Sequence, residues 1–383
     1  MDFALDNEQE LLRDTVTGFL ATRYHLAASR TVAKSGIGWQ PDIWRGFAKE
    51  LDILGATLPE SVGGMGGGPV ESMIIAEALG YALVVEPYVD TVIVGGGLLQ
   101  RAGGEQASTL LSGIASGDVI TALAATEPTS GYTLHDVTTT ATKDGDSWII
   151  NGAKIVVGSA PFATHLLLTA RTSGERRDTT GLSLFVIEFD AGNPPKGLEV
   201  HSYRTIDDRR AADLVFTDVR LPADALLGAE GTAWASLDQA IDEATAAVAA
   251  EAVGCMRKVL ADTVEYTKQR QQFGQPISSF QVLQHRMVDM SMELEQAVAA
   301  AHLAILNLDA EPKRRSRTIS AAKATIGRAA RFIGQNAVQL HGGMGMTEEL
   351  AIGHYFKRLT AIENEYGPAD FHIARYAALT RAD

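Results

Sequence analysis

The chain has 383 residues, 46% of them apolar, and a formal net charge of −14. The length allows two or three domains, and the acidic balance without a run of Lys or Arg argues against nucleic acid or an anionic membrane surface as a partner. The single cysteine, Cys255, excludes an internal disulfide. The single cysteine and the lack of a signal-peptide pattern at the N-terminus lead us to expect a cytoplasmic protein. No zinc-ligand spacing occurs, so we expect no metal site.

The N-terminal region, residues 1–116, has helical periodicity. Apolar residues recur at helical spacing between Glu8 and Arg23, and again between Pro69 and Leu83. This pattern predicts an N-terminal α-helical domain.

Residues 117–228 change to short apolar and β-branched runs that are separated by turn signals. The turns fall at Asp144-Gly145-Asp146 and at Asn151-Gly152. The strands are predicted at residues 138–142, 147–150, 166–170, 182–187 and 212–216. Because no long helical period intervenes, we expect a middle β-barrel or sandwich domain with antiparallel pairing.

Residues 229–383 are helical again. Gly274 and Pro276 are read as the stop of one helix and the start of the next. The long helices are predicted at Gly231–Lys268, Gln281–Asp309 and Lys313–Leu340. Long antiparallel helices with short connections predict a four-helix bundle. The fold class is therefore α+β, with a helical domain, a β domain and a helical bundle in that order.

Several segments, taken together, resemble the signatures of the acyl-CoA dehydrogenase family. They are Leu58–Gly66, Thr126–Pro128, Val215–Pro222, Arg270–Gln281 and Gln339–Gly345. The resemblance spans nearly the whole chain. It implies FAD as cofactor, an acyl-CoA substrate, an electron-transferring flavoprotein as acceptor, and a homo- or hetero-oligomer that is a dimer or a dimer of dimers (a tetramer). The implied reaction is α,β-dehydrogenation, in which a carboxylate takes the α-proton and the β-hydrogen leaves as hydride.

The resemblance also assigns FAD contacts to the C-terminal signatures. Arg270, Phe273 and Gln281 match residues that reach the FAD diphosphate and adenine of a neighbouring subunit. Gln339 and Gly343 match a second patch of the same kind. The residue types suit these roles, because a guanidinium donates to phosphate oxygens, an aromatic ring covers adenine, and glycine admits close backbone approach.

In the middle domain the resemblance is weaker. Thr126 matches the start of the flavin-contacting loop, and Val157 matches a position that offers its backbone N–H to the flavin. The family's serine on the thioester side falls at Tyr132, and its Trp-Ile-Thr segment reads Ile155-Val156-Val157. These departures fit a divergent flavin pocket, or a subunit that has lost FAD in a heteromeric pair.

The catalytic base is absent from both positions where the family places it. An ungapped match from Gly345 puts Tyr366 at the common position, with Glu365 one residue before it. The second position, counted back from Arg270, is Ala244, and Glu243 precedes it.

Glu251 is our first candidate for the base. It lies seven residues after Ala244, on the same helix face, and is the only charge from Ala244 to Met256. A lone acid among alanines is either kept for chemistry or paired with an Arg or Lys of a neighbouring helix. A similar Ala-Glu-x-x-Gly pattern occurs in relatives that resemble steroid side-chain and other bulky-acyl dehydrogenases, several of them heteromers. We therefore expect a bulky, branched or steroid-derived acyl chain.

Two other functions stay open at this point. The chain could be a non-catalytic or half-site subunit of a heteromeric acyl-CoA dehydrogenase. It could also be a flavin oxidase or monooxygenase on the same fold.

Overall fold

The computed structural model describes residues 4–381, and their contacts divide them into two compact units. The helical unit comprises residues up to Arg30, Pro69–Val84 and the chain from Thr245 onward. The β unit comprises Thr31–Gly68 and Val85–Ala244. The division cuts through the expected N-terminal domain, so the predicted three-domain bounds stay a prediction.

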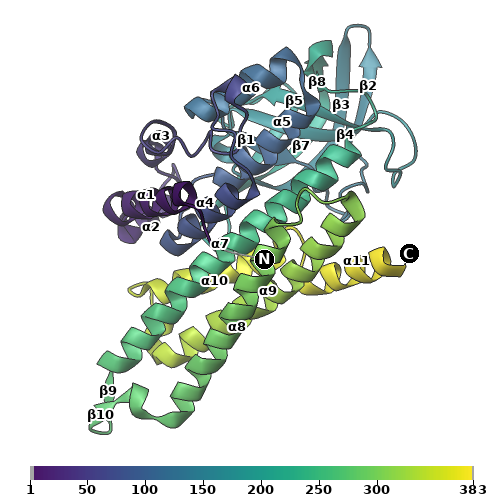
Figure 1. The fold of residues 1–383 in the computed structure, drawn as a ribbon. Coiled ribbons are helices and arrows are strands. Elements are labelled where there is room, and N and C mark those ends of the chain that lie inside the picture. The colour runs from purple at the N-terminus through teal and green to yellow at the C-terminus, as the bar shows by residue number, and fades with distance from the viewer. Residues whose placement is uncertain (1–3, 382–383) are drawn as a thin grey trace. The chain divides into compact units, whose positions relative to one another are not determined.

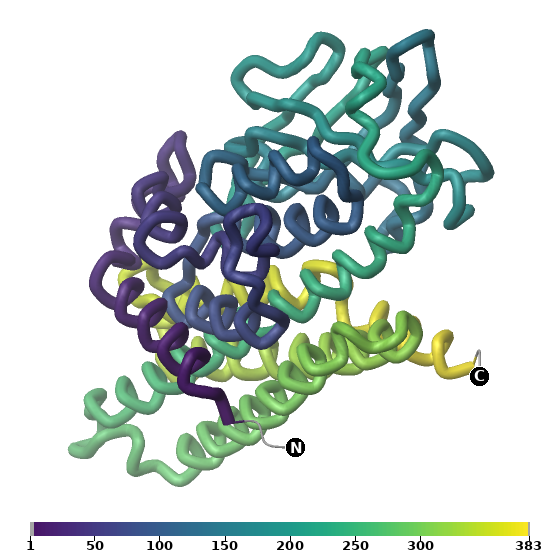
Figure 2. Tube along the Cα trace, turned by 45° about the horizontal axis from the view of Figure 1, so that its top comes forward, coloured from purple at the N-terminus to yellow at the C-terminus, as the bar shows by residue number. Residues whose placement is uncertain are grey.

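The helical unit is built around α9, which contacts α8, α10 and α11. Figures 1 and 2 show α8 and α9 lying alongside one another for most of their length. The helices are α1 (Asn7–Arg23), α2 (Leu26–Lys34, which extends beyond the unit), α4 (Pro69–Ala82), α7 (Trp234–Gln269, which begins outside it), α8 (Gln281–Ile305), α9 (Pro312–His341), α10 (Ala351–Asn364) and α11 (Ala369–Arg381). These bounds confirm the predicted long helices to within a few residues.

The start of α9 shows how the sequence fixes a helix end. The side chain of Glu311 caps the helix by accepting hydrogen bonds from the backbone N–H groups of Lys313 and Arg314. Pro312 occupies the first helical position, where a missing N–H costs nothing. The buried face of the helix that follows consists mostly of alanine, glycine and isoleucine.

The connection from α7 to α8 is a small β-hairpin and not simple helix punctuation. Strands β9 (Gln271–Gln272) and β10 (Gln275–Pro276) pair antiparallel. Phe273 and Gly274 form the two-residue turn, with φ of 54° and 77°. Positive φ at both central positions is what a tight hairpin turn requires. The sequence reading of Gly274 as a helix stop was therefore wrong, because α7 has already ended.

The β unit contains one sheet with the strand order β6-β7-β3-β2-β4-β5-β8, and β1 pairs with β4. The strands are β1 (Thr121–Ala124), β2 (Thr140–Asp144), β3 (Ser147–Gly158), β4 (His165–Arg171), β5 (Leu182–Glu188), β6 (Leu198–Arg204), β7 (Arg210–Pro222) and β8 (Leu226–Leu227). Most pairs are antiparallel, as predicted. The exceptions are β1 with β4, and a parallel contact between β2 and β4 at Thr140. The hairpin of β2 and β3 lies between β1 and β4 in the chain.

Helical segments complete the β unit. They are α3 (Pro41–Lys49), the π-helix η2 (Val89–Gly95), α5 (Gly96–Ala102) and α6 (Gly104–Ser116).

One predicted turn in the β unit is wrong. The hairpin turn at Gly145 is confirmed, since Asp144 pairs with Ser147. At Asn151-Gly152, by contrast, β3 continues with a bulge in its pairing to β7. Gly152 has φ of 148°, and a Cβ there would lie 2.4 Å from the Thr139 side-chain oxygen. The glycine marks a close approach of two chain segments and not a reversal.

Over residues 4–381, no helix combines the length and the hydropathy that a membrane span would need.

Candidate active site

Glu251, in the buried middle of α7, is paired with Arg358 of α10. Arg358 Nε donates to one carboxylate oxygen of Glu251 at 2.7 Å, and Nη2 donates to the other at 2.8 Å. Both side chains are only 4% exposed. This bidentate, charge-assisted pair is among the strong hydrogen-bonding arrangements in proteins. It is the buried ion pair that the sequence left open as the alternative to a base.

A close crossing of α4 and α7 fixes the backbone of Glu251. A Cβ on Gly80 would lie 2.0 Å from the Glu251 carbonyl oxygen, and a Cβ on Gly254 would lie 1.9 Å from the Glu77 carbonyl oxygen. Only glycine permits such an approach of two backbones. Arg257 Nε also bonds the Glu77 carboxylate at 2.6 Å across the crossing. Glu251 therefore has its backbone against α4 while its carboxylate reaches α10.

Glu365 shares the same guanidinium. The third nitrogen of Arg358, Nη1, lies 2.9 Å from Glu365 Oε2. The Glu365 side chain is 28% exposed, and so is more accessible than Glu251. The structure thus brings two of the predicted base candidates together on one arginine.

The turn that carries Glu365 follows α10 and is held from two sides. Lys323 of α9 donates to the carbonyl oxygens of Glu363 at 3.1 Å and of Gly367 at 2.8 Å. His372 Nε2 of α11 lies 3.1 Å from the carbonyl oxygen of Tyr366. Burial lowers the pKa of the Lys323 ammonium to about 8, although the carboxylates of Glu365 and Glu363 act in the opposite direction.

Glu243, the third base candidate, belongs to the β unit and is also paired. Arg101 of α5 bonds its two carboxylate oxygens at 2.9 and 3.0 Å. The Gln239 amide donates a further bond at 3.1 Å. The neighbouring family position, Ala244, is fully buried.

The predicted cross-subunit FAD residues of the helical unit all lie on its surface: Arg270, Phe273, Gln281, Gln339 and Gly343 are exposed. Phe273, in the hairpin turn, is 89% exposed. Space around Gly343 is open, with no atom within 4 Å of a Cβ built there. A guanidinium, amides, an accessible backbone and an uncovered aromatic ring suit a diphosphate and an adenine. The donor set therefore fits FAD.

The predicted flavin-contacting segments of the β unit adjoin one another. The carbonyl oxygen of Thr126 accepts from the backbone N–H of Ile155 at 2.9 Å. β3 bulges between Lys154 and Val157, and Val156 adopts φ of 52°. The side chain of Val157 is buried while Val156 is 58% exposed. A contact of the Val157 backbone with the flavin stays a prediction.

An ion pair that the sequence reading missed lies beneath these segments. Lys154 Nζ is 2.8 Å from Glu127 Oε1, and both side chains are almost fully buried. Glu127 also accepts from the backbone N–H groups of Thr138 and Thr139 at 2.7 and 3.0 Å. Burial alone would raise the pKa of Glu127, but the charge of Lys154 and these hydrogen bonds lower it to about 2.

The missed residues share one sequence signal. Lys154, Lys323 and Arg358 are cations at buried positions of a strand or helices whose other buried residues are mostly apolar. Such residues are rarely buried without a partner. The signal could have marked them as paired, but it could not have identified the partner.

Comparison with protein families matches the chain along nearly its whole length. The N-terminal domain of acyl-CoA dehydrogenase matches residues 6–118, the middle domain 122–219 and the C-terminal domain 231–378.

Individual relatives agree with these matches. Acyl-CoA dehydrogenase FadE12 of Mycobacterium tuberculosis is 31% identical over 360 residues, which cover 91% of this chain and 90% of the relative. A structure described as a variant of the Tcur3481–Tcur3483 steroid ACAD has a TM-score of 0.87 at 26% identity, covering 98% of each chain. The FAD complex of PigA has a TM-score of 0.90 at 25% identity, covering 100% of this chain and 99% of the other. The chain belongs to the acyl-CoA dehydrogenase family, whose members are FAD-dependent oxidoreductases.

Proposed function

We propose that this chain catalyses the α,β-dehydrogenation of an acyl-CoA thioester whose acyl chain is bulky, branched or steroid-derived, and passes electrons to an electron-transferring flavoprotein. The bound flavin supplies the two-electron acceptor for the β-hydrogen. Support for the substrate class comes from the Ala-Glu-x-x-Gly pattern at Glu251 and from the similarity to a structure described as a steroid ACAD.

The observation that carries the assignment of the base is the shared guanidinium of Arg358. Glu251 is bonded to it twice and is 4% exposed, whereas Glu365 has one contact with it and is 28% exposed. Removing one partner from a buried pair costs about 3–5 kcal/mol. We therefore propose Glu365, rather than our first candidate Glu251, as the group that takes the α-proton. Glu251 then holds Arg358 in place.

The test is anaerobic single-turnover reduction of the flavin with a panel of acyl-CoA thioesters. Glu365→Gln keeps the shape of the side chain but removes its basicity. We expect it to slow flavin reduction by about 10²-fold or more, the usual contribution of a positioned base. Glu349→Gln, an exposed acid of the same unit, is the matched control and should leave the rate unchanged.

Glu251→Gln decides between the two candidates. If Glu365→Gln reduces flavin at the wild-type rate while Glu251→Gln does not, Glu251 is the base. If neither substitution slows the reaction, both assignments fail.

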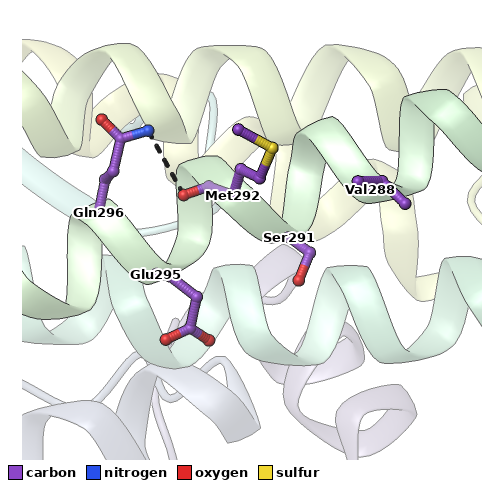
Figure 3. A pocket seen from close by; sticks show the side chains of 5 residues that line it. All are labelled: Val288, Ser291, Met292, Glu295 and Gln296. Carbon is purple, nitrogen blue, oxygen red and sulfur yellow. Dashed lines mark hydrogen bonds between the residues drawn. The ribbon is translucent and has the colours of Figure 1, made fainter.

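An oligomer is the second part of the proposal. The outer face of α8 carries exposed apolar side chains, including Val282 at 63%, Val288 at 57% and Met292 at 58% exposure. Val288 and Met292 line a shallow groove together with Ser291, Glu295 and Gln296, as Figure 3 shows. An apolar helix face of this kind is typical of an interaction site. We propose that a second subunit, like or unlike this chain, covers it.

A half-site subunit is the second candidate function. One observation favours it, because all three candidate carboxylates, Glu243, Glu251 and Glu365, are engaged by arginines. The absorption spectrum separates the two functions. A flavin band in the chain purified alone, bleached anaerobically by an acyl-CoA, supports the dehydrogenase. FAD retained only after co-production with an unlike subunit supports the half-site. Rapid reoxidation of the flavin by air would instead indicate an oxidase or monooxygenase.

A further inference from the structure

A strained turn ends α10 at the place where the family's common base position falls. Tyr366 has φ of 57° and Gly367 has φ of 113°. The left-handed conformation is unfavourable for a residue with a side chain. Strained residues persist only where the surroundings hold them, and they cluster at functional sites.

We propose that Lys323 is a positioning residue whose ammonium group fixes the turn from Glu363 to Gly367 and so sets where the Glu365 carboxylate lies. The proposal rests on the proposed function in one respect, since it takes Glu365 as the base. Lys323 itself is placed too deeply in the unit to touch a substrate, as it is only 1% exposed.

The contacts of Lys323 are those of a backbone clamp. Its hydrogen bonds, 3.1 and 2.8 Å long, lead to the carbonyl oxygens on either side of the turn, at Glu363 and Gly367. A cation that bonds two carbonyls constrains the path of the chain between them. Glu363 O also belongs to the last turn of α10, where helical carbonyls lack partners and a positive charge is favourable.

Charge balance explains how an ammonium group can be buried here. The carboxylates of Glu365 and Glu363 act on Lys323 favourably, while Arg358 opposes them. Glu363 is itself paired with Arg331, at 2.9 Å between Nη2 and Oε1. Lys323 and Arg358 together balance Glu251 and Glu365. The clamp and the proposed base thus belong to one electrostatic group.

Residues of α11 also hold the turn. His372 Nε2 contacts the Tyr366 carbonyl oxygen at 3.1 Å. A Cβ on Gly367 would lie 2.5 Å from the ring of Phe371. Lys323 and these two rings together restrain the turn that carries Glu365, whose carboxylate lies 2.9 Å from Arg358. Loss of the ammonium would remove two of the hydrogen bonds that hold the turn.

The experiment compares Lys323→Met with Lys357→Met, which removes the same charge from a half-buried position of α10. Backbone hydrogen exchange is followed at Gly367 and His372, whose N–H groups bond to Asn364 O and Pro368 O. We expect Lys323→Met to speed exchange at both amides by about tenfold or more, with exchange within α10 unchanged. We also expect flavin reduction to slow by about tenfold at a KM within about threefold of wild type. The control should change neither.

Lys323→Gln provides a milder variant in case the methionine variant does not fold. Its amide can still donate to one carbonyl, so intermediate exchange and an intermediate rate are expected. Unchanged exchange in a folded variant overturns the proposal whatever the activity. Faster exchange with an unchanged rate of flavin reduction overturns the link to the base. If Glu365→Gln reacts normally, the base assignment fails, and the exchange measurement still decides whether Lys323 holds the turn.

Discussion

Individual buried charges make the folding stability of this protein depend on pH. Burial alone would raise the pKa of Glu127, but Lys154 and the hydrogen bonds to the carboxylate lower it from 4.5 to about 2 on folding. A carboxyl group whose pKa is lower in the folded state stabilises the fold above its unfolded pKa. That stabilisation is lost as the pH falls from 4.5 toward 2. The acid limb of the unfolding curve of this protein should therefore include Glu127.

Glu127→Gln tests this response. It leaves the Lys154 ammonium buried without its carboxylate, and we expect it to lower the free energy of unfolding by about 3–5 kcal/mol at pH 7. The difference from wild type should shrink as the pH approaches 3. Urea unfolding at several pH values measures it. Asp144→Asn, which breaks an exposed pair with Arg220, should cost about 1 kcal/mol or less. Equal losses in the two variants would contradict the prediction.

Val156 is a second residue whose backbone conformation predicts a measurable change in the free energy of unfolding. It is β-branched and adopts φ of 52° at the bulge of β3, a conformation that such residues avoid. Its N–H is held by Asp213 Oδ1 at 2.9 Å. Val156→Gly should raise the free energy of unfolding by about 1 kcal/mol, since glycine adopts positive φ without strain. Val156→Ala keeps a Cβ and should gain much less. A destabilised glycine variant would show that the valine side chain makes contacts that outweigh the strain.

At the scale of elements, the crossing of α4 and α7 has the closest glycine approaches among the described residues of the helical unit. Gly254→Ala would place a Cβ 1.9 Å from the Glu77 carbonyl oxygen, so the helices must move apart. We expect a loss of about 3 kcal/mol or more in the free energy of unfolding. Gly18→Ala is the matched control, because a Cβ there meets nothing within 4 Å inside α1. It should stabilise by about 1 kcal/mol. Thermal unfolding of both variants is the measurement.

The elements also show which features a sequence can predict. Long helices such as α7 and α9 carry periodic apolar residues over many turns, so both were located closely. The turn predicted at Asn151-Gly152 was wrong because glycine serves a close approach as readily as a reversal. The parallel pairing of β1 with β4 depends on a partner beyond an intervening hairpin, and no local pattern reports it.

Individual residues of the candidate site could be predicted from the sequence, but their partners could not. Glu251 was recognisable as a lone acid among alanines. Its partner, Arg358, lies 107 residues away in the chain, and Lys323 lies 40 residues from Glu363. Pairing at such separations is set by how α7, α9 and α10 pack. Sequence reasoning could therefore state that Glu251 was either a base or an ion pair, and only the structure supplied the arginine.

At the scale of the whole molecule, substitutions on the exposed apolar face of α8 test whether the chain assembles through it. Val288→Glu combined with Met292→Glu places two like charges on the apolar groove, which should oppose burial against a second subunit. We expect a lower molar mass by light scattering and reduced retention of FAD. Thr15→Glu with Thr17→Glu adds the same charge at two exposed positions of α1 and should alter neither. An unchanged mass in the α8 variant would show that the subunit contact lies elsewhere.

The glycine crossing beneath Glu251 has a consequence for redesign. Because α4 and α7 meet through their backbones, the location of residue 251 depends on Gly80 and Gly254 and hardly on the side chain at 251 itself. The crossing therefore holds residue 251 at the same place in the fold whichever side chain it carries. Replacing Glu251 and Arg358 together by two apolar residues, or interchanging the two, should leave the packing of α4 against α7 unchanged. The position is a natural starting point for installing new reactivity on this chain.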